Sequence, residues 1–107
     1  MSIKAATKAA IRDCETLVKD TRDIVACDPK TVKPQDIEQL NERIRNFLCS
    51  LKQSLNIKGG VRKAFWDTKQ MWELIGEATT QIDSFNRKLP LDIPRILDGW
   101  YIRSYSP

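Results

Sequence analysis

Near the start of the chain, one row of mostly apolar residues recurs at alternating steps of four and three. This spacing places the row, here called the seam, on a single face of an α-helix. This heptad pattern predicts a first helix over about residues 3–26. Two threonines and an alanine weaken the seam as a free-standing coiled coil, so we expect a bundle within one chain. The seam consists of Ile3, Thr7, Ala10, Cys14, Leu17, Thr21 and Ile24.

Prolines mark the boundary between the first and second helices. Pro29 forces Asp28 away from helical geometry, whereas Pro34 suits the first turn of a helix, where its missing N–H is not needed. A second helix is predicted over about residues 34–56, and it is the most strongly amphipathic segment. Its apolar face carries Ile37, Leu40, Ile44, Phe47, Leu48, Leu51 and Leu55.

Gly59 and Gly60 end that helix, because glycine readily adopts the left-handed backbone of a helix terminus. A single third helix is predicted over about residues 61–88. Short connections make neighbouring helices antiparallel, so the predicted fold is one all-α domain, an antiparallel three-helix bundle spanning residues 1–107. The apolar stripe of this third helix, called the third stripe, comprises Val61, Phe65, Thr68, Met71, Trp72, Ile75, Ala78, Thr79, Ile82, Phe85 and Leu89.

The C-terminal segment, residues 90–107, is unlike the rest of the chain. Pro90 ends the third helix, and the following residues suggest a short helical turn before Gly99 and then an extended tail. Trp100, Tyr101 and Tyr105 crowd into its last eight positions. Burying these apolar side chains away from water is favourable. The segment therefore packs either on the chain's own bundle, as a lid, or on a partner or second copy, as a hook.

Trp66 falls about 140° from the centre of the third stripe if that helix is continuous. It then shares the opposite face with Lys69, Glu73 and Gly76. An aromatic side chain beside a small-residue notch is a candidate protein-docking surface. The equally weighted alternative is that the tail covers this face.

The positive charge of the chain is small and scattered. Lys and Arg number 18 against 14 Asp and Glu, a net charge of +4, and acidic residues interleave throughout. Nucleic-acid binders usually concentrate their basic residues into a patch. The best such cluster surrounds the second turn and is the alternative functional site: Arg45, Lys52, Lys58, Arg62 and Lys63.

The inventory of reactive side chains argues against catalysis. The chain has no histidine, and its three cysteines contain no CxxC pair, so neither a zinc site nor a disulfide framework is indicated. Cys49 lies off its helix's apolar stripe near Arg45 and Lys52, which favours a reactive thiolate, but no base accompanies it. No phosphate-binding loop or nucleophile elbow is present.

These observations predict a non-enzymatic protein-protein interaction module, an adaptor, assembly factor or small regulator, which binds a protein partner or a second copy. We expect no cofactor and no small-molecule substrate. The absence of a long apolar run or a secretion-signal core, together with the cysteine usage, predicts a reducing location, the cytoplasm or the nucleus.

Overall fold

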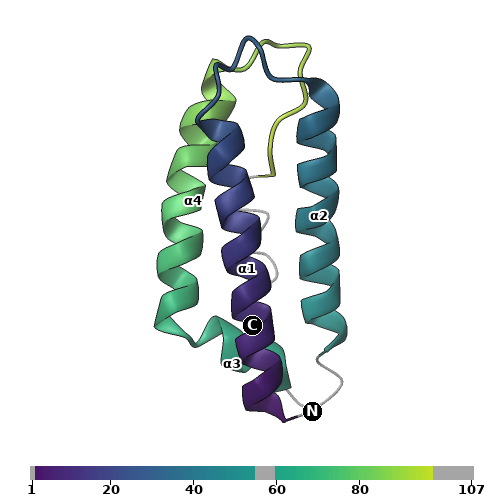
Figure 1. The fold of residues 1–107 in the computed structure, drawn as a ribbon, viewed down its shortest axis with the longest axis vertical. Helices are drawn as coiled ribbons and strands as arrows, with labels where there is room; N and C mark the ends of the chain where they lie inside the picture. Colours follow the sequence, from purple (N-terminus) through teal and green to yellow (C-terminus); the bar gives the residue numbers. More distant parts are fainter. Residues whose placement is uncertain (1, 55–59, 98–107) are drawn as a thin grey trace.

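The computed structural model describes residues 2–54 and 60–97, and within them every regular element is an α-helix. The predicted all-helical class is therefore confirmed. Figure 1 shows three helices, α1 (Ile3–Val25), α2 (Pro34–Gln53) and α4 (Lys69–Lys88), running lengthwise, while the short α3 (Gly60–Trp66) lies across the lower end.

Local capping accounts for the ends of α1. The Ser2 hydroxyl accepts a hydrogen bond from the Ala5 N–H at 3.1 Å, which satisfies one of the free donors of the first turn. Beyond Val25, the Asp28 side chain accepts from the Lys30 N–H at 3.0 Å and its carbonyl accepts from the Thr31 N–H at 2.9 Å. The Asp-Pro pair thus builds a tight turn that directs the chain into α2.

Pro34 occupies the first turn of α2, with Asp36 close behind it, as the helix dipole favours. The helix ends at Gln53, and Ser54 follows as its cap, donating its hydroxyl proton to the Ser50 carbonyl at 2.8 Å. The end of α2 therefore comes before the predicted residue 56, and residues 55 and 56 lie outside the described ranges.

The prediction of one continuous helix over 61–88 is wrong, because the helix breaks at Asp67 and Thr68. The Thr68 hydroxyl donates to the Ala64 carbonyl at 2.8 Å, and the Thr68 backbone is extended, with ψ of 122°. Because Thr16 and Thr21 make the same bond inside the unbroken α1, the extended backbone of Thr68, and not this bond, interrupts the helix. Thr68 therefore closes α3 and serves as the N-cap position of α4.

Up to Leu97, the last described residue, the short helical turn predicted after Pro90 is also absent. The Ile93 N–H bonds the Pro90 carbonyl at 3.1 Å, and residues 94–97 then have no regular secondary structure. Figure 1 shows this segment descending between α4 and α2. Four of its backbone polar groups are bonded by side chains of the two helices, so these groups need no helical turn to satisfy them.

We call the side chains that hold this segment the amide clamp, which consists of Asn41 on α2 and Asn86 on α4. Asn41 accepts from the Leu97 N–H and donates to the Arg95 carbonyl. Asn86 accepts from the Ile96 N–H and donates to the Ile96 carbonyl. All four distances are 2.9 Å, and Ile96 is only 1% exposed.

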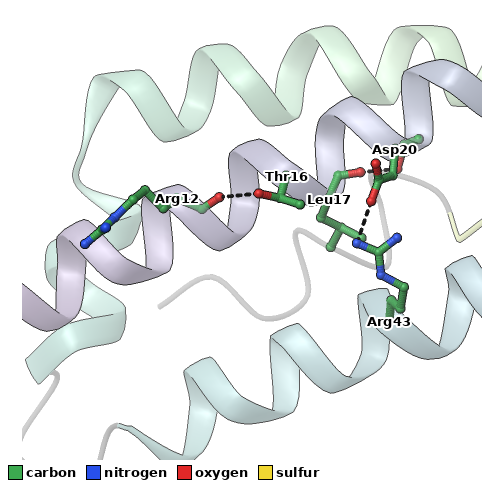
Figure 2. A network of polar contacts seen from close by, with 6 residues as sticks. Arg12, Thr16, Leu17, Asp20 and Arg43 are labelled. Atoms are coloured by element: carbon green, nitrogen blue, oxygen red, sulfur yellow. Dashed lines mark hydrogen bonds and ion pairs between the residues drawn. The ribbon is translucent and has the colours of Figure 1, made fainter.

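The helices meet along their apolar stripes, and the exposed rims add ion pairs. Arg43 of α2 bonds Asp20 of α1 at 2.7 Å, and the Thr16 hydroxyl donates to the Arg12 carbonyl at 3.1 Å, as Figure 2 shows. Arg22 of α1 pairs with Glu77 of α4. The core combines Cys14, Val18, Ile37, Leu40, Ile44, Leu48, Leu51, Phe65, Trp66, Met71, Ile75, Ala78, Ile82, Phe85, Leu89 and Ile96.

Candidate functional site

The prediction that Trp66 is an exposed docking anchor is wrong. Its side chain is 2% exposed and is among the largest fully buried side chains of the described residues. The break at Asp67 and Thr68 explains the error, because α3 follows its own axis and turns Trp66 inward with Phe65. The two ring centroids are 5.3 Å apart in an edge-to-face arrangement.

Trp72 occupies the exposed position instead. The predicted stripe placed it in the core, yet Trp72 is 42% exposed, because it lies at the edge of the buried row that Met71, Ile75 and Ala78 form on α4. Its ring centroid lies 5.4 Å from that of Trp66, with the two ring planes tilted by 42°. Trp72 therefore rests on a buried aromatic base of Trp66 and Phe65.

Three predicted site residues remain exposed on α4 near this tryptophan. Lys69 and Glu73 form an exposed ion pair at 3.7 Å, and Gly76 lies one turn after Trp72. A Cβ added at Gly76 would meet nothing within 4 Å, so this glycine does not accommodate a close neighbour among the described residues. We call Lys69, Trp72, Glu73 and Gly76 the Trp72 face.

The buried indole beneath this face carries an unusual feature. Among the described residues, the Trp66 N–H has no hydrogen-bond partner, although it is inaccessible to water. Buried donors are normally paired. The Trp72 face thus covers a rigid aromatic layer, and the burial of Trp66 accounts for its off-stripe position without any docking role.

The tail residues of the predicted site, Trp100, Tyr101 and Tyr105, lie outside the described residues. The described members of the alternative nucleic-acid cluster lie on two helices, α2 and α3. Arg45 and Lys52 are exposed on α2, whereas Arg62 is half-buried on α3.

Lys63 and Lys58 are the other two members of this basic cluster. Lys63 is exposed, but its ammonium group pairs with Asp67 at 3.1 Å, which offsets part of the positive charge. Lys58 lies outside the described residues. The structure therefore brings Lys63 next to an acid that the linear pattern did not take into account.

The cysteines differ sharply in their surroundings. Cys14 is buried, and this burial, with a smaller effect of the negative charge of Glu15, raises the pKa of its thiol to about 12. A thiol so rarely ionised is a poor nucleophile. Cys27 and Cys49 are exposed and unpaired with any other cysteine.

Within residues 2–54 and 60–97, no group of three or more Cys, Asp or Glu side chains is placed to hold a metal ion. In the same ranges, none of the helices is both long and apolar enough to cross a membrane. The amide clamp was not predicted from the sequence. The only indication of it there is the position of two asparagines beside the apolar faces of their helices. Comparison of the chain with protein-family models, with curated proteins and with solved structures found no match.

Proposed function

We propose that this protein is a non-enzymatic protein-protein interaction module that docks through the Trp72 face. The observation that carries the proposal is the 42% exposure of Trp72 above the buried rings of Trp66 and Phe65. Tryptophan is among the side chains that most often dominate interface energies. In this proposal the helices, arranged as an antiparallel bundle closed by the C-terminal segment, serve as the scaffold.

The neighbours of Trp72 suit a docking role. The buried Trp66 ring contacts the Trp72 ring, which reduces the conformational entropy lost on binding. Gly76 leaves open space one turn away, where the backbone of a partner can approach. Lys69 and Glu73 provide a charged rim, as is typical around the apolar centre of an interface.

The partner of this face is a protein surface that offers an apolar pocket for an indole ring. A second copy of the chain is the simplest such partner, and concentration-dependent assembly would reveal it. Two of the three exposed large apolar side chains among the described residues, Ile3 and Trp72, belong to helix starts at the same lower end of the molecule. That end is therefore the expected contact region.

Site-specific photo-crosslinking tests the proposal directly. A photoreactive residue at position 72 of the full chain is expected to yield one defined crosslinked species, either a dimer or a partner complex. The matched control is the same residue at Gln35, which is exposed at the opposite end, near the start of α2. Crosslinking at position 72 that does not exceed the control contradicts the proposal.

Substitution and salt dependence complete the test. Trp72→Ala is expected to abolish the crosslinked assembly, detected from a neighbouring label at Lys69, while the variant retains cooperative unfolding. A docking contact made by apolar surface should change little between low and moderate salt, whereas binding to DNA or RNA through Arg45, Lys52 and Arg62 would weaken steeply. Steeply salt-dependent binding to nucleic acid, with no protein crosslink, would favour the alternative function.

A further inference from the structure

The first three turns of α1 carry positive charge and no negative charge. Between residues 2 and 12 the chain has three basic residues, Lys4, Lys8 and Arg12, and no acidic residue. The three recur at steps of four, so they follow one another along one side of the helix over about 12 Å. All three are exposed. We call them the basic row.

The basic row keeps its charge in the folded protein. Within the part of the chain that the structure describes, none of its three side chains takes part in an ion pair. Of the next acidic residues along α1, Asp13 lines a groove beside α2, whereas the Glu15 carboxylate accepts a hydrogen bond from the Gln70 amide of α4 at 2.8 Å. Glu15 therefore offsets part of the charge at the Arg12 end of the row, and the Lys4 end has no acidic neighbour on its helix.

The fold gathers further positive charge at the same end of the molecule. The short α3 lies across the lower end and packs on α1, bringing Arg62 and Lys63, of which Lys63 is paired with Asp67. The upper half behaves differently, because residues 20–42 and 83–97 together carry eight acidic and six basic residues. The positive charge that is spread thinly along the sequence is therefore concentrated at the lower end of the folded chain.

An exposed aliphatic side chain lies next to the basic row. Ile3 directly precedes Lys4 and is 47% exposed, although isoleucine is usually buried. It belongs to the first turn of α1, so a surface that meets this end of the molecule contacts Ile3 and the basic row together. The phosphate backbone of a nucleic acid binds cations but gives an aliphatic side chain no apolar layer to enter. A bilayer of anionic lipids offers both, since its charged headgroups cover hydrocarbon.

We propose that the start of α1 is a contact site for the surface of an anionic membrane. The basic row lies against the lipid headgroups, and Ile3 enters the boundary between headgroups and hydrocarbon. Charge complementarity and the exposed Ile3 carry the assignment. Three cations and one aliphatic side chain make a reversible, peripheral contact. The site shares no residue with the Trp72 face and does not rest on the proposed function.

Cosedimentation of the full chain with lipid vesicles tests the site. Vesicles of phosphatidylserine and phosphatidylcholine, about one part to two, are compared at low salt with vesicles of phosphatidylcholine alone. Lys4→Gln, Lys8→Gln and Arg12→Gln are introduced together. This variant is expected to partition onto the anionic vesicles about 100-fold less, since each basic residue near such a surface contributes about fivefold, or ~1 kcal/mol.

A matched control removes the same charge from the opposite end of the molecule. Lys30→Gln, Lys33→Gln and Arg87→Gln together replace two lysines and one arginine that are exposed and form no ion pair among the described residues. This control is expected to keep binding within a few fold of the unsubstituted chain, because its substitutions lie beyond the Debye length of ~8–10 Å from the membrane. Equal losses in the two variants would mean that only net charge matters, and would overturn the proposal.

The aliphatic side chain gives a second, independent measurement. Ile3→Gln is expected to weaken binding to the anionic vesicles about fivefold, because roughly half of its apolar surface is still available for burial. Leu91→Gln is the control, since Leu91 is 97% exposed but lies at the upper end. An unchanged affinity for Ile3→Gln removes the apolar part of the contact and overturns the proposal.

Duplex DNA is titrated as the rival polyanion. Binding to DNA that depends on the basic row, without binding to the anionic vesicles, assigns the row to nucleic acid and overturns the proposal. Absence of binding to the anionic vesicles overturns it whatever the chain does with DNA. Vesicle binding is measured without a protein partner, and crosslinking at position 72 is measured without vesicles. Failure of this inference and failure of the proposed function are therefore distinguishable.

Discussion

At the scale of single residues, the side chains that organise the C-terminal segment are two amides. Asn41 and Asn86 each use both the oxygen and the nitrogen of the side-chain amide. Four backbone groups of residues 95–97, a segment that belongs to no helix or strand, thereby find hydrogen-bond partners. An apolar side chain of similar size would leave those groups unpaired. Buried polar groups that lose a partner cost more than the hydrogen bond itself contributes.

We therefore expect Asn41→Ala to lower the free energy of unfolding by about 1–3 kcal/mol, because it leaves the Arg95 carbonyl and the Leu97 N–H unpaired. Urea denaturation followed by circular dichroism measures the change. Asn46→Ala is the control, since Asn46 is exposed on the same helix, and its effect should stay within about 0.5 kcal/mol. Equal effects of the two substitutions would contradict the clamp.

Cys14 makes stability depend on pH at the alkaline end. Its pKa is raised from 9.0 to about 12 by burial, so the folded state holds the thiol proton more tightly than the unfolded state does. This contribution is fully present below about pH 9 and is lost as pH rises toward 12. We expect the free energy of unfolding of Cys14→Ala, measured with urea, to fall less steeply across that range; identical slopes would refute the assignment.

At the scale of elements, the two-residue break between α3 and α4 accounts for the burial of Trp66. A continuous helix over 61–88 puts Trp72 on the core stripe and Trp66 outside, and the observed arrangement is the reverse. Helical periodicity relates two residues only while the helix is uninterrupted. Across Asp67 and Thr68, the packing of each helix sets its own phase.

The break predicts a reversed order of mutational costs. Trp66→Ala is expected to lower the free energy of unfolding by about 3–5 kcal/mol, as removal of a large buried side chain does. Trp72→Ala should cost only about 1 kcal/mol, mainly through lost ring contact with Trp66. Urea denaturation of both variants gives the comparison, and a larger cost at Trp72 would contradict the burial of Trp66 and the exposure of Trp72.

Gly76 lowers the stability of α4, and no close neighbour among the described residues requires a glycine at this position. It lies inside the helix, with nothing within 4 Å of an added Cβ. Gly76→Ala is therefore expected to raise the free energy of unfolding by about 1 kcal/mol, because glycine is that much less favourable in a helix interior. Thermal denaturation detects the gain, and a loss of stability would show that another part of the chain contacts this glycine.

At the scale of the whole molecule, apolar burial rather than surface charge holds the helices together. The ion pairs between helices, Asp20 with Arg43 and Arg22 with Glu77, join side chains that are all more than a third exposed. Exposed pairs contribute little, and salt screens them further. The shared apolar core is therefore the main source of cohesion.

This balance predicts a stability that is insensitive to salt. Between about 0.05 and 0.5 M NaCl, the free energy of unfolding should change by less than about 1 kcal/mol, since only exposed ion pairs are screened. Urea denaturation at the two salt concentrations measures it. A drop of several kcal/mol would show that the charge pairs between helices dominate the assembly.

The sequence by itself determined the all-helical class, the amphipathic stripes of α1 and α2 and the turn between them, because heptad spacing, prolines and caps act over a few neighbouring residues. Tertiary structure decided the break at Thr68, the burial of Trp66, the exposure of Trp72 and the pairing of Asn41 and Asn86 with the C-terminal segment. Those outcomes depend on side chains that approach from distant parts of the chain, and local periodicity carries no information about such contacts.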